Sequence, residues 1–251
     1  MSPESLDPRA AVIPRRLAGV RRILLVAGGK GGVGKSACAA VGGLLLARRG
    51  LAVGLLDLDF EGASAHLFLG SSPRLPQEAG GILPLEEAYG LKLMSVASFA
   101  AERPLAMRGA DLSAALLELL AVTIWGELDV LLVDMPPGMG DQLLDVLRLM
   151  PAAEALLVTT ASPVALAVSL RLATLLQACR LPILGVVENM HRAPGDAVGA
   201  AARDRGLPFL GALPFDAALE AAVGRPEALV SGALGRALDR ALDPLPRRTL
   251  A

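Results

Sequence analysis

The sequence has few of the features that indicate a crosslinked, nucleic-acid-binding or membrane protein. Two cysteines in 251 residues exclude a disulfide framework and make a self-contained metal site hard to build. A net charge of −1 provides no basic field for nucleic acid. The apolar stretches at 36–47 and 155–176 are too short or too interrupted for the ~20 clean residues of a membrane span. Residues 1–16 have no signal-peptide core, so we expect a cytoplasmic protein with no nucleic-acid or membrane partner.

Aliphatic side chains, in contrast, are abundant. Hydrophobic residues make up 53% of the chain, and the excess lies in Ala, Leu and Val. Apolar runs that read as strands alternate with helical patterns, which is typical of βαβ units on a parallel sheet buried on both faces. We therefore predict a single α/β domain over residues 19–242, whose mostly parallel sheet of about seven or eight strands is flanked by helices on both faces. A disordered leader at 1–18 and a flexible tail at 243–251 are expected to flank this domain.

The same patterns predict where the elements lie. We expect helices at 35–49, 111–125, 163–179 and 197–205. We expect strands at 22–27, 51–56, 91–96, 129–133, 154–160, 182–187 and 207–213. Residues 60–89, which are rich in Gly, Pro and Ser, are expected to form a loop with short helical turns.

The most specific pattern is a glycine-rich loop after the first predicted strand. It begins at Gly28, and its residues 29–36, GKGGVGKS, match G-x-x-x-x-G-K-[ST] at the start of a predicted helix. In that context backbone N–H groups and the helix dipole face a triphosphate, Lys35 reaches the β- and γ-phosphates, and the Ser36 hydroxyl ligates Mg²⁺. The expected nucleotide contacts here are Gly29, Lys30, Gly31, Gly32, Val33, Gly34, Lys35, Ser36 and Ala37. The sequence therefore predicts a P-loop NTPase that binds ATP and Mg²⁺.

The use of lysine supports this prediction independently. Of 24 basic residues only Lys30, Lys35 and Lys92 are lysine, and two of these three stand in the glycine loop. The planar fork of arginine cannot replace the compact ammonium group there. The loop therefore requires lysine for geometric reasons.

The run from Lys30 to Ser36 resembles the deviant Walker A loop of the MinD/ParA/Mrp/ApbC group of P-loop ATPases. In that group the additional lysine, here Lys30, reaches the nucleotide bound to the other subunit. The resemblance implies a homodimer that holds two ATP molecules between its subunits and hydrolyses them slowly. Lys30 and Lys35 are then catalytic residues.

Two acidic clusters stand at the ends of predicted strands, where open α/β sheets bind their ligands. Asp134 ends the run LDVLLVD and fits the Walker B aspartate, which holds Mg²⁺ through water. Asp57 and Asp59 end the second predicted strand. The resemblance implies that these positions help to place the metal and the attacking water. We therefore assign Asp57 to the Mg²⁺ site with Ser36 and Asp134, and we assign Asp59 to catalysis.

Two further segments resemble the Mrp/ApbC branch of this group. Residues 134–141, DMPPGMGD, look like its DxPPGxGD segment, and residues 184–190, LGVVENM, look like its GxVENM strand end. The resemblance implies that Asn189 hydrogen-bonds the adenine edge. It also implies that the turn at Leu213 and Pro214 packs beside the base.

Proteins of that branch act as iron–sulfur cluster carriers or scaffolds, and a CxxC pair after ENM lets two subunits ligate one cluster. This chain departs from the pattern, because His191 follows Met190 and no cysteine comes later. Cys38 and Cys179 should lie at opposite edges of the sheet, since a helix of about 17 residues spans roughly 25 Å. We interpret both cysteines as buried small hydrophobes and His191 as a solvated loop residue. Whether this chain binds a cluster stays open.

These observations lead to one principal hypothesis and two alternatives. The principal hypothesis is a homodimeric Mg-ATP hydrolase of the Mrp/ApbC type that acts in iron–sulfur cluster assembly or transfer, with cluster ligands from a scaffold or client protein. The first alternative is a positioning or partitioning switch like MinD or ParA, which needs an anchor; the proline-containing tail from residue 241 forms no anchoring amphipathic helix. The second is a metallochaperone ATPase, which needs a partner that the sequence does not reveal.

Overall fold

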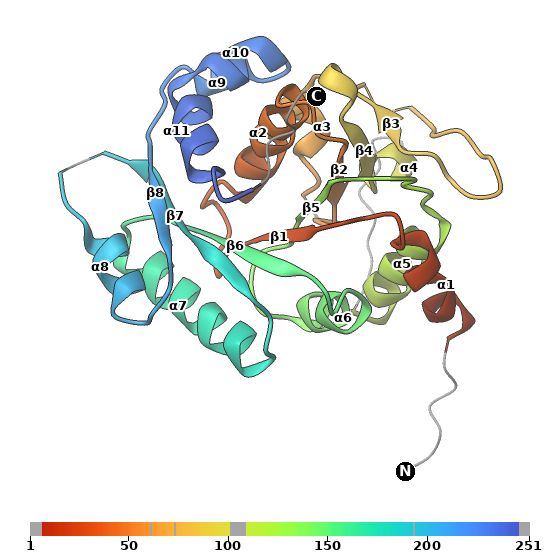
Figure 1. The fold of residues 1–251 in the computed structure, drawn as a ribbon, viewed down its shortest axis with the longest axis horizontal. Coiled ribbons are helices and arrows are strands. Elements are labelled where there is room, and N and C mark those ends of the chain that lie inside the picture. The colour runs from red at the N-terminus through yellow and green to blue at the C-terminus, as the bar shows by residue number, and fades with distance from the viewer. Residues whose placement is uncertain (1–6, 61, 73, 101–108, 193, 246–251) are drawn as a thin grey trace.

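An eight-stranded sheet lies between two layers of helices (Figure 1). The computed structural model describes residues 7–60, 62–72, 74–100, 109–192 and 194–245. The strand order across the sheet is β3-β4-β2-β5-β1-β6-β7-β8. The strands are β1 (Ile23–Ala27), β2 (Val53–Asp57), β3 (Leu85–Glu86), β4 (Lys92–Ser95), β5 (Val130–Asp134), β6 (Glu154–Thr159), β7 (Ile183–His191) and β8 (Phe209–Pro214).

All neighbouring strands run parallel except β3, which pairs with β4 in the antiparallel sense. The central strands β1, β2 and β5 are buried at all five positions, as expected for a sheet covered on both faces. Successive side chains of a strand alternate between the faces, so Leu24 and Val26 join one core cluster while Ile23 and Leu25 join the other. This arrangement brings the carboxyl ends of β1, β2 and β5 together at one edge of the sheet.

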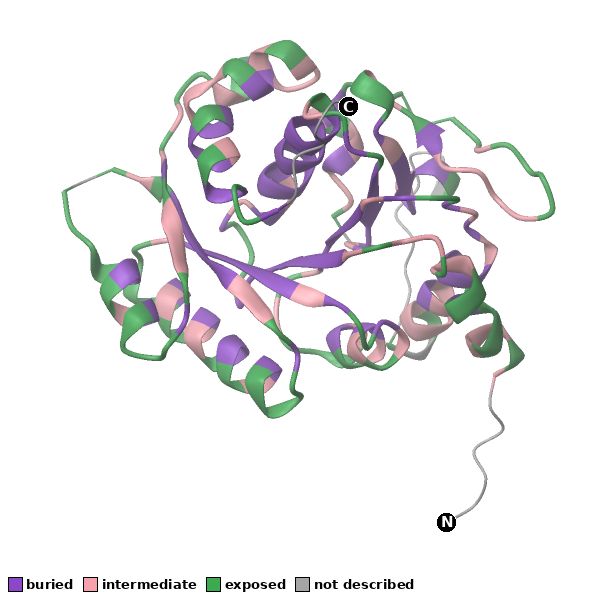
Figure 2. Ribbon diagram, viewed as in Figure 1, coloured by how far each residue is buried: buried purple, intermediate pink, exposed green. Residues whose placement is uncertain are grey.

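The helices form two layers, one on each core cluster, and Figure 2 shows their buried sides facing the sheet. One layer holds α2 (Lys35–Arg48), α3 (Ala65–Leu69), α9 (Leu219–Ala222), α10 (Pro226–Ser231) and α11 (Ala233–Ala241). The other holds α1 (Pro8–Arg16), α5 (Gly109–Val122), α6 (Asp141–Leu149), α7 (Pro163–Ala178) and α8 (Ala197–Arg203). The short elements η1 (Ala88–Gly90) and α4 (Ala97–Ala100) flank β4 in the chain.

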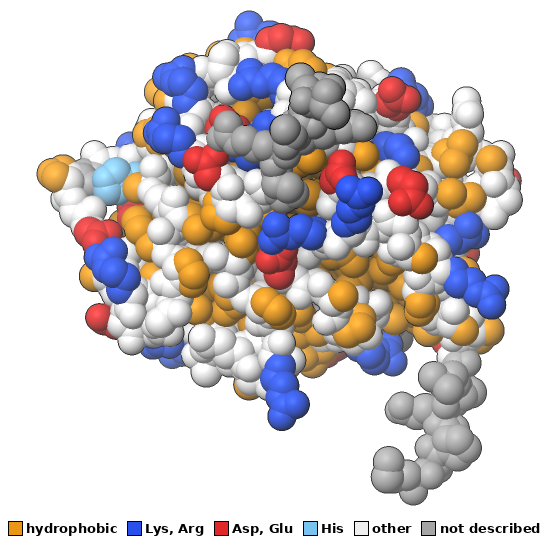
Figure 3. All heavy atoms as spheres, in the orientation of Figure 1, with side chains coloured by type: hydrophobic (Ala, Val, Ile, Leu, Met, Phe, Trp, Pro, Cys, Tyr) orange, Lys and Arg blue, Asp and Glu red, His pale blue; other side chains and the backbone are white. Residues whose placement is uncertain are grey.

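The fold class predicted from the sequence is confirmed: a single α/β domain with a mostly parallel sheet covered on both faces. The prediction missed helices α4 and α6, and it missed strand β3 within the expected loop at 60–89. None of the described helices combines the length and the apolar character needed to cross a membrane. On the face shown in Figure 3, basic and acidic side chains alternate with apolar ones.

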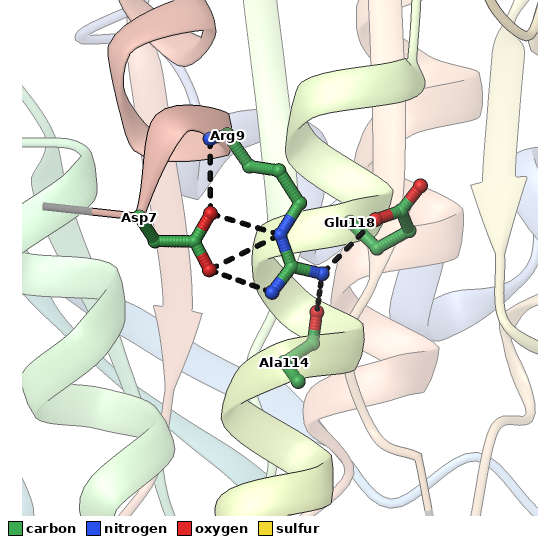
Figure 4. A network of polar contacts seen from close by, with 4 residues as sticks. All are labelled: Asp7, Arg9, Ala114 and Glu118. Carbon is green, nitrogen blue, oxygen red and sulfur yellow. Dashed lines mark hydrogen bonds and ion pairs between the residues drawn. The ribbon is translucent and has the colours of Figure 1, made fainter. Parts of the chain in front are cut away.

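The prediction of a disordered leader at 1–18 is wrong at residues 8–16. These residues form helix α1, which packs against α5. Residues 1–6 of the expected leader and 246–251 of the expected tail lie outside the described part of the chain. Asp7 caps α1 by accepting from the Arg9 backbone N–H, and the Arg9 guanidinium donates to Glu118 Oε2 at 3.0 Å (Figure 4). Ile13, 1% exposed, joins the core cluster under α5. A tertiary contact therefore orders a segment whose own sequence is polar and interrupted by proline.

We predict that Ile13→Ala destabilises the domain, because Ile13 is buried in the core although it lies in the leader. Removing a buried isoleucine side chain costs roughly 2–5 kcal/mol. Val12→Ala is the matched control, since Val12 is 38% exposed on the same helix and its loss should change stability by less than about 0.5 kcal/mol. Chemical denaturation of both variants measures the difference. Equal, small effects would mean that α1 does not pack on the core.

Candidate nucleotide-binding site

The glycine-rich loop connects the end of β1 to the start of α2 at the carboxyl edge of the sheet. Gly28 and Gly29 are buried, and Lys30, Gly31 and Gly32 are exposed. A Cβ added at Gly29 would lie 2.6 Å from the backbone carbonyl carbon of Val168, so only glycine lets the loop run this close to α7. The loop therefore lies directly before the N-terminus of α2, where backbone N–H groups and the helix dipole attract an anion.

Lys35 begins α2 and is only 7% exposed. Burial lowers the pKa of its ammonium group, while the negative charges of Asp134 and Asp59 act in the opposite direction. The structure thus brings Lys35 together with two of the three predicted acidic residues. Ser36, which is half-buried, follows it in the first turn of the same helix.

Asp134 and Asp57 occupy directly paired positions on β5 and β2, and both are completely buried. Burial raises the pKa of Asp134, and the charge of Asp57 adds to this rise. Ser36 and Lys35 lower the same pKa, but neither carboxylate oxygen of Asp134 completes a hydrogen bond within the protein. An unpartnered buried carboxylate is costly, so this side chain is suited to a cation.

The surroundings of Asp134 fit Mg²⁺. This ion takes oxygen ligands, and in nucleotide sites one or two protein ligands suffice because phosphates and water supply the rest. The free oxygens of Asp134 and the nearby Ser36 hydroxyl meet this requirement. Asp57 is less open, because its oxygens already accept from the backbone N–H groups of Asp59 and Ala65. Of the two predicted aspartates, Asp134 therefore fits the ion better.

Asp59 and Lys30 lie on the two loops that border this carboxylate pair. Asp59 is half-buried, and its Oδ1 accepts from the Gly62 N–H at 3.0 Å, which fixes its side chain beside the loop after β2. Lys30 is exposed, and its side chain makes no hydrogen bond or ion pair within the described part of the chain. Its ammonium group is therefore available to a ligand or to a second protein chain.

A cavity of about 220 Å³ lies next to the loop, between the ends of β7 and β8. Its walls include Gly34, Ala37, Asn189, Met190, Pro214 and Phe215. Predicted base-contact residues Asn189 and Pro214 line this cavity. Leu213 does not: its side chain is fully buried in the core and can only support the wall from behind. The cavity adjoins the first turn of α2, where a base attached to a loop-bound phosphate would lie.

Sequence reasoning missed Arg192, Phe215 and Glu188 at this edge and misjudged His191, because their contacts form between strand ends. The Arg192 guanidinium lies 3.5 Å from the centroid of the Phe215 ring, and Phe215 lines the cavity. His191, expected to be solvated, is partly buried, and its Nδ1 lies 2.7 Å from Oε1 of the buried Glu188. The only sequence signal for Glu188 was its place beside Asn189 in the ENM triplet.

The cysteines follow the prediction in part. Cys38 is buried at the start of α2, where desolvation and the charge of Asp134 raise the pKa of its thiol to about 12. Cys179 caps the far end of α7 and is exposed, so the expectation that it is a buried small hydrophobe is wrong. In the described part of the chain, no group of three or more His, Cys, Asp or Glu side chains is arranged to hold a metal ion.

Known proteins resemble this chain in both sequence and fold. It is 38% identical to the iron–sulfur cluster carrier protein of Mycobacterium tuberculosis over 265 aligned residues, which cover 96% of this chain and 69% of the relative. The nucleotide-binding protein of Archaeoglobus fulgidus, solved in complex with ADP, superposes with a TM-score of 0.73 at 27% identity, covering 95% of this chain and 94% of that one. The cell division ATPase MinD of Pyrococcus furiosus shares the fold, with a TM-score of 0.67 at 23% identity over 88% of this chain and 96% of that one.

A family model for the ParA group, described as the NUBPL iron-transfer P-loop NTPase, matches residues 19–245. This range contains the glycine loop, the paired aspartates and the cavity beside them. The chain therefore belongs to the ParA/NUBPL family of iron-transfer P-loop NTPases.

Proposed function

We propose that two copies of this chain bind and hydrolyse Mg-ATP, and that this cycle drives transfer of an iron–sulfur cluster whose ligands come from a scaffold or client protein. The buried carboxylate of Asp134 carries the proposal. Both of its oxygens lack hydrogen-bond partners, and it lies next to Lys35 at the mouth of the glycine loop. A buried carboxylate whose oxygens complete no hydrogen bond favours a cation beside it, and Mg²⁺ bound to a triphosphate would supply one.

We infer hydrolysis from the positive charges and N–H groups that the residues around the loop would present to the phosphates. The loop N–H groups and Lys35 hold the phosphate oxygens, on which negative charge is spread in the transition state. Ser36 and Asp134 would hold Mg²⁺, which neutralises charge on the β- and γ-phosphates. Asp59, whose Oδ1 accepts from the Gly62 N–H and whose charge acts on Lys35, would orient the attacking water. The exposed Lys30 of a second copy would add its positive charge beside the γ-phosphate.

The cargo proposal rests on the relatives and on the chemistry of the cysteines. Proteins 38% identical to this chain are named iron–sulfur cluster carriers. A cluster takes thiolate ligands, usually four. The Cys38 thiol is buried with a raised pKa, and Cys179 lies at the far end of α7, so the two are poorly placed to share a cluster. The ligands that hold the cargo therefore belong to another protein.

Asp134→Asn is expected to stabilise the nucleotide-free protein and to remove its stabilisation by Mg-ATP. In the unfolded chain the carboxyl ionises near pH ~4, whereas burial raises its pKa in the folded chain. Folding stability therefore falls as the pH rises above that value, and asparagine removes this loss. Chemical denaturation at about pH 8 should give a higher free energy of unfolding for the variant, with a smaller difference at about pH 5. A variant less stable than wild type at the higher pH would contradict the proposal.

Mixing two inactive variants tests the contribution of Lys30 across the dimer. Lys35→Ala should weaken ATP binding by roughly 10- to 100-fold, because it removes a charged contact worth about 1.5–3 kcal/mol. Lys30→Ala should bind ATP normally but lose hydrolysis and ATP-dependent dimerisation. In a mixed dimer the Lys35→Ala subunit retains Lys30. It can supply this lysine to the nucleotide bound by the Lys30→Ala subunit, whose Lys35 is intact.

We therefore expect each variant alone to be inactive and the mixture to regain hydrolysis at one site. Titration calorimetry measures binding, phosphate release measures turnover, and sedimentation measures the dimer. Arg48→Ala, at the exposed far end of α2, is the control for a lost cation outside the site. Full turnover by Lys30→Ala alone would rule out the role across the dimer.

Anaerobic reconstitution with iron and sulfide tests where the cluster ligands come from. We expect the chain alone to retain no stoichiometric iron and sulfide after desalting. A scaffold carrying a cluster should transfer it to an apo-client faster when this chain and Mg-ATP are present. A cluster that stays on the isolated dimer would show that the chain supplies its own ligands. Equal transfer rates with and without the chain would argue against a role in transfer.

A further inference from the structure

Asn189 connects the phosphate-binding loop to the base cavity through a contact that its position in the sequence does not suggest. It lies near the end of β7, is 4% exposed, and lines the cavity. Its Nδ2 donates a hydrogen bond to the backbone carbonyl of Val33 at 2.9 Å, across 156 residues of sequence. One hydrogen of this amide group is therefore used by the loop itself.

Gly34, which follows Val33, leaves the space that the Asn189 side chain occupies. Gly34 has a φ of +86°, and a Cβ added there would lie 2.2 Å from Asn189 Nδ2. Any other residue at this position would displace the amide or the loop. The requirement for glycine before Lys35 thus comes from the packing of Asn189 as well as from the bend of the backbone.

The bond to Val33 fixes the direction of a loop N–H. A trans peptide group is planar, and its C=O and N–H point in opposite directions. The Val33 carbonyl and the Gly34 N–H belong to the same peptide group. Once Asn189 holds the carbonyl, the N–H must point away from Asn189, and the group cannot rotate without breaking the bond.

We propose that Asn189 is a positioning residue for the phosphate-binding loop, in addition to lining the base cavity. It acts on the triphosphate through the Val33–Gly34 peptide group, so its effect requires no base on the ligand. This inference rests on the proposed binding of ATP by the loop. It differs from a role in base recognition alone, in which Asn189 would affect only ligands that carry a base.

Inorganic tripolyphosphate separates these two roles because it has phosphates but no base. We expect Asn189→Ala to weaken binding of both Mg-ATP and Mg-tripolyphosphate, each by roughly 3- to 10-fold, the effect of one lost hydrogen bond. Phe215→Ala is the matched control: it alters the cavity wall but leaves the loop intact, so it should weaken Mg-ATP binding and leave Mg-tripolyphosphate binding unchanged. Titration calorimetry on the full-length protein measures all four affinities.

Hydrogen–deuterium exchange of the nucleotide-free protein gives a second readout. Asn189→Ala should increase deuterium uptake in the peptide that contains residues 28–36, and Phe215→Ala should not. If Asn189→Ala fails to fold, Asn189→Ser keeps a polar group at this buried position but is too short to reach Val33. If the Asn189 variant shows wild-type exchange in the loop and wild-type affinity for Mg-tripolyphosphate, the inference is overturned. If the wild-type protein binds neither ligand, the proposed function fails, while the exchange comparison still decides the role of Asn189.

Discussion

The burial of two aspartates side by side is the constraint on which the site depends. Asp57 and Asp134 stand opposite each other on neighbouring strands, with no exposure to solvent. The backbone after β2 satisfies Asp57, but no protein donor satisfies Asp134. The ionised form of Asp134 is therefore unfavourable in the absence of a nearby cation. Lys35 offsets part of this cost and itself loses hydration by doing so.

The parallel sheet makes this arrangement possible. The carboxyl ends of β1, β2 and β5 meet at one edge, where the glycine loop leaves β1 and the two aspartates end the other strands. Helix α2, buried along nearly its whole length, fixes the start of the loop, and α7 packs against Gly29. Asn189 also fixes the loop, because its Nδ2 donates a hydrogen bond to the Val33 carbonyl. Phosphates would thus meet N–H groups that are already in place, which is how fixed dipoles contribute to catalysis.

Local patterns in the sequence were enough to predict the fold class and to place the glycine loop and the aspartates at strand ends, because each depends on neighbouring residues or on strand ends that a parallel sheet must bring together. Helix α1 could not be predicted, since its order comes from packing Ile13 under a helix about a hundred residues later. The burial of Leu213 and the bond from Asn189 to Val33 also depend on contacts between distant segments. The resemblance to a family pointed to Asn189 and Pro214, which line the cavity, but not to the atoms that they contact.

The most direct test of this account is a crystal structure of the protein with Mg²⁺ and a non-hydrolysable ATP analogue. We predict a triphosphate enclosed by the backbone N–H groups of residues 28–36, with Lys35 at its outer phosphates. The metal ion should lie on the side of Ser36 and Asp134, and the base should occupy the cavity beside Asn189. A nucleotide bound elsewhere, or a loop that holds no phosphate at saturating ligand, would contradict the account.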